Sequence, residues 1–477
     1  MSRINTNIPS MIAQRVFNAQ NRGLSESLTR LSTGLRINTG KDDPAGLIAS
    51  EALRTEKVAI GAAITNVSRA NNVVSTAEGG LDEINKLLTE LEDLVDRSAN
   101  VDGISEDERD ANQLQIDAII DSINRIANST EFQGKKLLSG ELDYTTSGID
   151  TNNFTDVAIN SARVPNGGVR DVIVEVTQSA QLANLIYSGT ATGSGTTTLQ
   201  IVGANGAETL SFGSATAISA VATAVNASTE LTGVTARVSG SNLVFESTDY
   251  GSDQFVTVRA LQGTFTVTGG DSGTDTDRGR DAGVLINGIT ANVRGLNARL
   301  QSTTLSVEMR LSSTFGTTLG SDSFSVTGGG ALFQISPTVE LSGQANIGIR
   351  AVSAGSLGNN VDGFISSLAS GQTNALTQPD GSDGNFAVAQ RIIRAAQTQV
   401  AELRGRLGAF QKDTLETTAN ALAITLENTT AAESTIRDTD FASETSNLTR
   451  AQILVQSATN TLRLANTQPQ TILSLLG

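Results

Sequence analysis

Apolar residues recur every seven positions toward both ends of the chain, and the middle has a different pattern. The clearest run consists of Ile60, Val67, Val74, Leu81, Leu88 and Val95. This spacing predicts a long amphipathic helix that needs a partner helix, because an apolar stripe with a period near 3.5 is buried only by packing against another helix. A helix over about residues 45–100 would be roughly 80 Å long at 1.5 Å per residue.

A matching pattern lies on the C-terminal side. Apolar residues three and four positions apart are Ile393, Ala396, Val400, Leu403, Leu407 and Phe410. The pattern then resumes one residue out of phase, at Leu415, Ala419, Leu422 and Leu426. Such a slip changes the supercoil locally without ending the helix. We expect both runs to form the packed interior of a helical rod.

The two extremities carry further stripes. Near the N-terminus these are Phe17, Leu24, Leu28, Leu31 and Leu35, and near the C-terminus Leu448, Ala451, Val455, Ala458, Leu462 and Ala465. Core-facing helices of one ordinary bundle would explain such stripes. Their placement at both ends favours assembly instead, because each stripe must find the other or another subunit, and a head-to-tail contact that does not close makes a helical filament.

Breaks in the pattern divide the helical parts. The segment LRINTGKDDPAG at 35–46 contains Gly40, Asp42, Asp43 and Pro44, which predicts a hinge followed by a helix that begins near the proline. The long helix is expected to end at about 100–103. Ser105 and Glu108 then match a capping box that opens a third helix.

The middle of the chain alternates with a period of two. Five segments predict strands: VIVEV at 172–176, TLQIV at 198–202, VTARV at 234–238, NLVFES at 242–247 and FVTVRA at 255–260. Ile218, Val221 and Val225 predict one short helix between them. A module at about 190–260 is therefore expected to be a hairpin, a helix and further strands. Residues 331–350 could pair back onto the rod.

Composition excludes most chemistry and several partners. The 477 residues include no His and no Cys, which removes triads and most metal or haem sites that depend on them. A pair of carboxylates could still hydrolyse glycosides, but such sites usually bind sugars on aromatic rings, and the chain has no Trp. The net charge of −16 argues against nucleic acid. No apolar run is long enough to insert in a membrane, and the N-terminus lacks the apolar core of a secretion signal.

Three local clusters contain residue types that are common at binding sites. Asp271, Asp275, Asp277 and Asp281 superficially resemble a calcium loop, but the closing Glu is missing, so a solvated loop is expected. Gly328–Gly330 lacks the Lys-Ser/Thr of a phosphate loop, so a flexible turn is expected. The acidic run Glu90, Glu92, Asp93 and Asp96 is expected to face solvent. No catalytic, cofactor or metal site is predicted, and the chain is not expected to be an enzyme.

Both ends resemble a known family. The segments LTRLSTGLRINTGKDDPAGLIAS at 28–50 and IRDTDFASETSNLTRAQILVQSATNTLRLANTQPQTILSLL at 436–476 closely resemble the two terminal signatures of bacterial flagellins. The resemblance extends over about 1–140 and 385–477. Residues 328–358 look like the inner β segment of the family, and 203–238 are similar to a small insertion of flagellins and hook-associated proteins.

The resemblance implies an α+β multidomain fold, in which long terminal helices pair as a coiled coil and rod bundle and a Gly- and Thr-rich β domain is inserted in the middle of the chain. Three domains are implied: a terminal coiled-coil core (1–44 plus 436–477), a helical rod with a β-hairpin (45–185 plus 328–435), and a surface domain (186–327) that contains the module at about 190–260. The chain would be an extracellular subunit that polymerises into the swimming filament.

The resemblance also implies roles and partners. The core coiled coil would consist of Phe17, Leu24, Leu28, Leu31, Leu35, Leu448, Val455, Leu462 and Leu464. The hinge between core and rod would consist of Asn38, Gly40, Asp42, Asp43, Pro44, Asp438 and Asp440. The partners would be other copies of the chain, flagellar cap and hook-associated proteins, and a flagellin-specific export chaperone, with export of the unfolded chain through the flagellar type III apparatus.

Two other functions are compatible with parts of the sequence, and one segment departs from the family pattern. A hook–filament junction protein shares the paired terminal helices and is the nearest alternative. From another class, the middle could host a surface enzyme or glycan-binding adhesin. The segment at 81–100 aligns with a region that many flagellins use to contact an innate immune receptor. Leu94 matches there, but Glu90 replaces a basic residue, which argues against recognition by that receptor.

Overall fold

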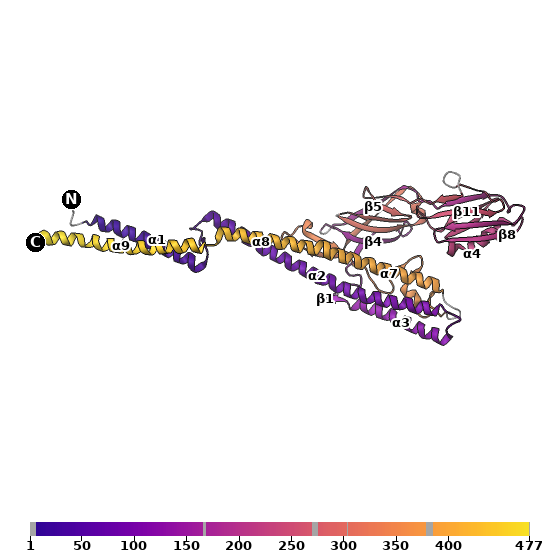
Figure 1. Ribbon diagram of the computed structural model, residues 1–477, viewed down its shortest axis with the longest axis horizontal. Coiled ribbons are helices and arrows are strands. Elements are labelled where there is room, and N and C mark those ends of the chain that lie inside the picture. Colours follow the sequence, from indigo (N-terminus) through magenta and orange to yellow (C-terminus); the bar gives the residue numbers. More distant parts are fainter. Residues whose placement is uncertain (1–5, 166–167, 270–274, 303, 378–384, 477) are drawn as a thin grey trace. The chain divides into compact units, whose positions relative to one another are not determined.

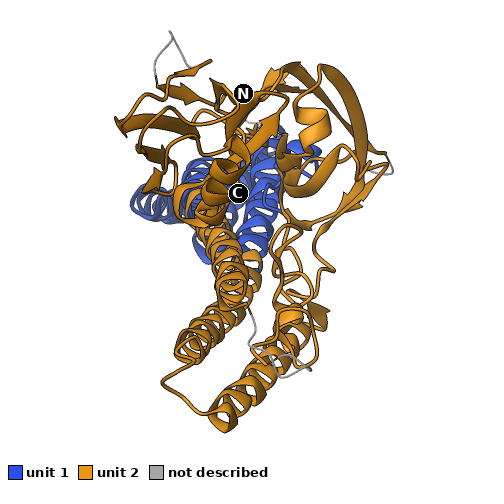
Figure 2. Cartoon of the chain, turned by 90° about the vertical axis from the view of Figure 1, so that its right-hand side faces the viewer, with its two compact units in different colours: residues 1–69, 334–343, 415–477 blue, residues 70–333, 344–414 orange. Residues whose placement is uncertain are grey.

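The computed structural model describes residues 6–165, 168–269, 275–302, 304–377 and 385–476, with side chains up to residue 468. The chain forms two compact units (Figure 2). Unit 1 consists of Met1–Arg69, Gln334–Gly343 and Leu415–Gly477, and unit 2 of Ala70–Phe333 and Gln344–Thr414.

Long helices occupy both ends of the chain, as Figure 1 shows. The helices are α1 (Ile8–Thr33), α2 (Pro44–Ser98), α3 (Glu106–Ser129), α4 (Ile218–Ala227), α5 (Thr229–Thr232), α6 (Ser313–Gly316), α7 (Phe386–Ala409), α8 (Thr417–Arg437) and α9 (Phe441–Leu476). Helix α2 therefore spans nearly the range that its seven-residue repeat predicts.

Local chemistry sets the ends of these helices. Asn7 precedes α1, and its side chain accepts a hydrogen bond from the Ser10 N–H. Gly34 ends α1 with φ +73°, a left-handed conformation that favours glycine. The predicted capping box of α3 is confirmed, because Glu108 N–H donates to Ser105 Oγ at 3.2 Å and Ser105 N–H donates to Glu108 Oε2 at 3.0 Å.

The phase slip after Phe410 corresponds to a π-helical segment, Phe410–Glu416, which joins α7 to α8. A π turn accommodates one additional residue within a helix. Leu403, Leu407, Leu415 and Leu422 are all buried, although the sequence spacing after Leu407 is one residue longer than a heptad.

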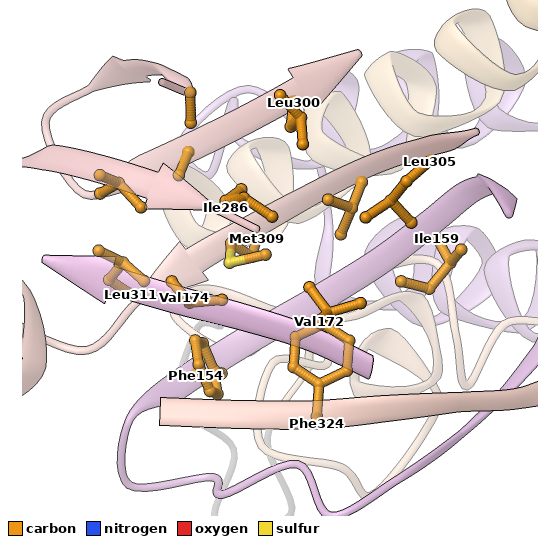
Figure 3. Close-up of a cluster of buried hydrophobic side chains, with 14 of the residues drawn as sticks. Phe154, Ile159, Val172, Val174, Ile286, Leu300, Leu305, Met309, Leu311 and Phe324 are labelled. Carbon is orange, nitrogen blue, oxygen red and sulfur yellow. The ribbon is translucent and has the colours of Figure 1, made fainter. Parts of the chain in front are cut away.

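Unit 2 contains the sheets. Its strands include β3 (Tyr144–Ser147), β4 (Phe154–Ala162), β5 (Arg170–Gln178), β14 (Gly283–Ile286), β15 (Ile289–Thr290), β16 (Asn292–Arg294), β17 (Asn297–Gln301), β18 (Leu305–Leu311) and β19 (Gly320–Gly329). These form a five-stranded sheet in the order β15-β14-β5-β19-β3 and a four-stranded sheet in the order β16-β17-β18-β4. The two sheets share one apolar core, in which Phe154 packs edge-on against Phe324 (Figure 3).

A second core lies in the module that follows β5. Its strands are β6 (Asn184–Ser188), β7 (Thr197–Gly203), β8 (Ala207–Phe212), β9 (Val234–Ser239), β10 (Asn242–Ser247), β11 (Phe255–Gln262), β12 (Val267–Thr268) and β13 (Thr276–Arg278). They form two four-stranded sheets, β12-β6-β10-β9 and β13-β11-β7-β8. Ile218, Val221 and Val225 of α4 are buried in this core, as their spacing predicts.

Short β pairs complete the described elements. They are β1 (Glu131–Phe132) with β2 (Lys135–Lys136), β20 (Ala331–Gln334) with β21 (Gln344–Ile347), and β22 (Gly358–Asn359) with β23 (Gly363–Phe364). The segment 331–350 thus pairs with itself. Gly328 and Gly329 are the end of β19, paired with β3, so the flexible turn predicted for Gly328–Gly330 is wrong for these two residues. Gly330 lies in the bend between β19 and β20, with φ +78°.

The predicted fold class is confirmed. In sequence order, helical terminal regions flank a β-rich middle, and all five predicted strands are present within β5, β7, β9, β10 and β11. Within the described residues no helix is both long and apolar enough to cross a membrane.

Candidate assembly interface

Helices α1 and α9 of unit 1 pair in antiparallel fashion along their length (Figure 1). Asn7 Nδ2 donates to the Ala465 carbonyl at 2.9 Å, and Ser10 Oγ donates to Asn466 Oδ1 at 2.6 Å. These bonds fix the N-terminal end of α1 beside the C-terminal part of α9. The chain therefore brings its two extremities together, as the stripes predict.

The seam between α1 and α9 is built from small and half-buried side chains. Ala13, Ala458 and Ala465 are buried. The half-buried apolar residues on the two helices are Phe17, Leu24, Leu31, Leu448, Val455 and Leu462. Leu35 follows α1 and is also half-buried. Alanine at the seam permits close approach but buries little area, so this pair alone is weakly stabilised.

Two residues predicted for the coiled coil do not lie in this seam. Leu28 is 49% exposed and Leu464 is 70% exposed. Leu28 follows the buried Ser27, and Leu464 precedes the buried Ala465. One residue turns a helix by about 100°. Their side chains are therefore directed away from the α1–α9 contact, where another surface could cover them.

Exposed apolar side chains are concentrated in unit 1. Among the described residues, 24 large apolar side chains are exposed, and 14 of them belong to this smaller unit. On α1 they are Ile8, Met11, Ile12, Val16 and Leu28, and on α9 Phe441, Ile453, Leu454 and Leu464. Others are Ile48, Val58, Val339, Leu341 and Ile424. Exposed apolar side chains that are concentrated on one unit are typical of an interaction site.

A buried charge lies at the other end of the α1–α9 pair. Glu444 is only 6% exposed, and its Oε2 lies 3.8 Å from Arg30 Nη1. Arg30 also contacts Glu26 at 2.5 Å. The i, i+4 spacing of Glu26 and Arg30 is visible in the sequence, but the partner on α9 is not, because the register between distant helices has no local signal.

The predicted hinge residues from the two ends of the chain meet. Leu35 and Asp438 form an antiparallel bridge, Arg36 N–H donates to the Arg437 carbonyl at 2.7 Å, and Thr439 N–H donates to the Gly34 carbonyl at 2.9 Å. The segments between α1 and α2 and between α8 and α9 are thus joined by backbone hydrogen bonds. We call residues 34–44 and 438–440 the connector.

Side chains give the connector a defined shape. Asp42 Oδ2 accepts hydrogen bonds from the backbone N–H groups of Asn38 and Thr39, at 3.1 and 2.8 Å. The bond from the Thr39 backbone is the main reason that the pKa of the Asp42 carboxyl lies below its usual range. Asn38 Nδ2 donates to Thr33 Oγ1 at 2.9 Å and to the Leu35 carbonyl at 3.2 Å.

Aspartate side chains of the connector also cap the starts of α9 and α2. Asp440 Oδ1 accepts from the N–H of Ala442 at 2.9 Å, at the start of α9. Asp43 Oδ1 accepts from the Gly46 N–H at 2.9 Å, and Pro44 is the first residue of α2. Gly40 is exposed. All seven predicted hinge residues therefore lie in the connector.

Beyond the connector, unit 1 contains the first part of α2 together with α8. Lys57 Nζ lies 2.5 Å from Glu433 Oε2, and Arg437 Nη1 lies 2.9 Å from Glu51 Oε1. Ile60 and Val67 are buried. These contacts join the segments of unit 1 that come from opposite ends of the chain.

The remaining predicted rod residues belong to unit 2. Those that are buried on α2 and α7 are Val74, Leu81, Leu88, Val95, Ile393, Val400, Leu403 and Leu407. Phe410 is half-buried, and its ring lies 6.1 Å from that of Phe333. Arg404 of α7 forms ion pairs with two residues of α2, Glu78 at 2.8 Å and Asp82 at 3.0 Å.

The acidic run on α2 is not wholly solvent-facing, contrary to the prediction. Glu92 accepts from Arg394 Nε at 3.1 Å and from Gln397 Nε2 at 2.9 Å, and Asp96 accepts from Gln390 at 3.0 Å. The bond from Gln397 is the main reason that the pKa of Glu92 is lowered. Periodicity alone could not reveal these partners, because α7 lies about 300 residues away. Glu90 is exposed, whereas Leu94 is buried.

The aspartates of the acidic loop bind protein groups rather than one another. Asp275 pairs with Arg259 at 3.0 Å, Asp277 accepts from the Asn184 N–H at 2.6 Å, and Asp281 accepts from the Gly295 N–H at 2.7 Å. Asp271 lies outside the described residues. The solvated loop expected for the whole cluster is thus wrong for these three carboxylates, whose partners lie on other segments of unit 2.

Comparisons with known proteins agree with the architecture. The family profile described as the bacterial flagellin N-terminal helical region matches residues 4–143, and the bacterial flagellin C-terminal helical region matches residues 391–476. Flagellin B of Helicobacter pylori is 29% identical over 525 residues, and flagellin of Salmonella typhimurium is 29% identical over 511 residues. Each alignment covers 99% of this chain and 99% of the relative.

Solved structures give much weaker likenesses. FliC from Burkholderia pseudomallei is 17% identical and has a TM-score of 0.23, with 72% of this chain and 98% of that chain covered. The flagellar hook-associated protein-3 from Legionella pneumophila is 14% identical and has a TM-score of 0.30, with coverage of 80% and 97%. Because both scores are low, these structures do not distinguish between the two kinds of protein.

Proposed function

The chain belongs to the bacterial flagellin family, and from this premise we propose that it is a structural subunit which polymerises through its paired terminal helices into the extracellular flagellar filament. Relatives named as flagellins match it over 99% of their length and of its own. The family is structural, and no catalytic group is needed for this role.

The observation that carries the proposed mechanism is the outward apolar surface of the α1–α9 pair. Ile8, Met11, Ile12 and Val16 follow one another along α1 and remain exposed after α1 has paired with α9. Complete burial of such a side chain contributes roughly 1.5–3 kcal/mol. Burial of these residues against neighbouring copies would supply the free energy of polymerisation. It would have to exceed the free-energy cost of the entropy lost on association.

We assign Leu28 and Leu464 to the same role. Both were predicted for the coiled coil, and both point away from the intramolecular seam. As members of the outward surface they would contact another copy. Phe17, Leu24, Leu31, Leu35, Leu448, Val455 and Leu462 would hold the pair together within one subunit.

The connector would be the joint between a terminal core domain and a helical rod domain. Support comes from its backbone bridge between Leu35 and Asp438 and from the side-chain bonds of Asn38, Asp42 and Asp43. The proposed domains are 1–44 plus 436–477 for the core, 45–185 plus 328–435 for the rod, and 186–327 for the surface domain. Small rearrangements of the connector would set filament supercoil.

Other partners follow from the same family membership. The chain would leave the cell unfolded through the flagellar type III apparatus, bound beforehand by an export chaperone that shields its apolar termini. In the assembled flagellum it would contact the cap and the hook-associated proteins. Because Glu90 is acidic and Leu94 is buried, we do not assign recognition by an innate immune receptor.

Seeded polymerisation tests the proposal. Purified monomer is mixed with short filament fragments and imaged by electron microscopy, beside a variant that lacks residues 1–40. We expect long tubes from the intact chain and none from the truncated one. Short caps or persistent monomer from the intact chain would contradict a filament subunit and would favour a junction protein.

A further inference from the structure

A polar cleft in unit 2 has no role in the proposed polymerisation. It has a volume of about 700 Å³ and lies between the outward face of the sheet β16-β17-β18-β4 and residues of the 350–364 segment and α7. Amide side chains make up a large part of its lining, namely Asn292, Asn297, Asn359, Asn360 and Gln399. The charged residues of the lining are four arginines and three carboxylates, namely Arg294, Arg299, Arg310, Arg350, Asp156, Glu308 and Glu402.

Two of the arginines stand in one row across the sheet. Arg294 of β16 is opposite Asn297 of β17, and Asn297 is opposite Arg310 of β18. Directly opposed residues on neighbouring strands have Cβ atoms about 5 Å apart, so the two guanidinium groups flank a short amide. Both arginines and Asn297 also line an adjoining cavity of about 350 Å³. The row therefore lies where the two cavities meet.

The charges in the cleft are unevenly neutralised. Arg299 pairs with Glu308 at 2.8 Å and with Glu402 at 3.8 Å, and Arg350 pairs with Asp156 at 3.6 Å. Neither Arg294 nor Arg310 forms an ion pair with any carboxylate in the described part of the chain. Two guanidinium groups, which are charged at every physiological pH, are thus left without a partner at this end of the cleft.

Nearby carboxylates are engaged elsewhere. Asp281 interacts electrostatically with Arg294, but its carboxylate accepts hydrogen bonds from the N–H groups of Ser252 and Gly295. Asp362 interacts electrostatically with Arg310, but it forms its ion pair with Arg391, at 2.9 Å. Asp156 is opposite Arg310 in the sheet, but its contact is with Arg350. Asp249 and Asp253 line the smaller cavity and are the remaining acids that an anion would meet.

We propose that this cleft binds a saccharide that carries a carboxylate or sulfate group, with the anionic oxygens held between Arg294 and Arg310. Guanidinium groups form paired, charge-assisted hydrogen bonds to such oxyanions. Asn292 and Asn297 offer amide donors and acceptors, which suit hydroxyl groups. The side chains of Asn359, Asn360 and Gln399 already form hydrogen bonds within the protein. Phe364 and Val361 are the larger apolar side chains of the lining apart from Met309, so the cleft does not suit a mainly apolar ligand.

The overall charge of the protein limits the size of the ligand. With a net charge of −16, the molecule repels long polyanions at low ionic strength, which disfavours nucleic acid. A short acidic saccharide presents one charged group to the clamp and neutral hydroxyls to the rest of the cleft. An acidic side chain of a second copy is the competing occupant.

Binding to the full-length monomer tests the inference. The probes are a disaccharide of glucuronic acid and N-acetylglucosamine, a neutral disaccharide of N-acetylglucosamine, and inorganic sulfate, each followed by titration calorimetry and ligand NMR. We expect the acidic disaccharide to bind, the neutral one to bind at least tenfold more weakly, and sulfate to compete. Affinity should fall as NaCl rises, because the contact is charged and partly exposed.

Arginine variants localise the site. Arg310→Gln and Arg294→Gln should each weaken binding about tenfold, because each removes a charged hydrogen-bond donor. Arg97→Gln is the matched control, since Arg97 is an exposed arginine of unit 2 outside the cleft lining. Should the Arg310→Gln variant fail to fold, Arg294→Gln decides alone, because Arg294 is exposed whereas Arg310 is half-buried.

Three outcomes would overturn the inference: no binding of the acidic disaccharide, equal binding of the neutral one, or unchanged affinity in the Arg294→Gln and Arg310→Gln variants. If these variants bound the saccharide normally but polymerised poorly, the occupant would be a second copy of the chain. Saccharide binding is measured on monomer and polymerisation on seeded filaments, so failure of one proposal is distinguishable from failure of the other.

Discussion

At the level of single residues, Gly46 shows how tightly the connector meets α2. A Cβ atom at Gly46 would lie 2.4 Å from Asp43 Oδ2 and 2.7 Å from Ile37 Cδ1. The Asp43 side chain caps α2 through the Gly46 N–H, and Ile37 is buried. A methyl group at this position would therefore have to displace a helix cap and a packed side chain together.

Gly46→Ala should destabilise the monomer by about 1–2 kcal/mol, because the strain and the disturbed cap outweigh the better helix propensity of alanine. Thermal unfolding followed by circular dichroism measures the change. Gly40→Ala is the control, since its Cβ would meet only Leu47 Cδ2 at an ordinary 3.5 Å. Equal stability of the two variants would show that the connector accommodates the methyl group.

Leu28 tests the outward surface of α1. Leu28→Asp should leave the monomer folded, because the side chain is already half-exposed, but it should abolish polymerisation if a neighbour covers it, since an unpaired buried charge costs several kcal/mol. Seeded growth measured by sedimentation and microscopy gives the result. Asn18→Asp adds the same charge at an exposed polar position of α1 and should polymerise. Normal filaments from Leu28→Asp would contradict the assignment.

Sequence reasoning identified the right helix faces but not always the right partner for a residue. Phe17 and Leu24 are turned toward α9, whereas Leu28 is turned outward, yet all three belong to one apolar pattern in the sequence. A single helix can carry one stripe for its own chain and another for a neighbour, and spacing does not separate them. The partners of Glu92 and Glu444 were unpredictable for a related reason, because they come from helices hundreds of residues away.

At the level of elements, the π segment Phe410–Glu416 explains the extra residue in the C-terminal stripe. Leu407 and Leu415 are both buried although eight residues separate them, one more than a heptad. A regular α-helix would turn Leu415 about 100° away from the stripe. The π turn accommodates that residue, and both side chains are buried.

Deletion of Lys412 should therefore convert the π segment into regular α-helix and keep the stripe continuous. We expect a thermal midpoint within a few degrees of the parent, because Lys412 is exposed and no buried side chain is lost. Deletion of the exposed Ala401, within regular α7, is the matched control. It should turn Leu403 and Leu407 out of phase with Val400 and lower the midpoint markedly. Equal damage from both deletions would mean that the π segment is not a simple insertion.

The elements themselves were largely predictable, because each has a strong local signal. The seven-residue repeat predicted α2, the Ser105–Glu108 capping box predicted the start of α3, and alternation predicted five strands. The order of strands in the sheets was not predictable, since pairs such as β5 with β19 join residues about 150 apart in sequence. The row of Arg294, Asn297 and Arg310 was not predictable for the same reason, because it depends on the pairing of β16, β17 and β18.

At the level of the whole molecule, the net charge of −16 bears on assembly, because polymerisation brings many copies of one acidic chain together. Like charges slow the encounter and weaken the product, whereas the apolar surface of unit 1 favours association. The balance between the two depends on ionic strength. At about 0.01 M salt the screening length is roughly 30 Å, and at about 0.15 M it is roughly 8 Å.

Elongation from seeds should therefore accelerate several-fold when NaCl is raised over this range, because screening removes repulsion but leaves apolar contacts intact. The growth rate is followed by light scattering at fixed monomer concentration. A variant with Glu90→Gln, Asp102→Asn and Asp110→Asn removes three exposed negative charges and should show a flatter dependence on salt. If elongation instead slowed steadily as NaCl rose, attraction between opposite charges on neighbouring copies would have to dominate the encounter. Arg294 and Arg310 of the cleft would then be the first place to look for that attraction, because they are positive groups that form no ion pair with a carboxylate of the described residues.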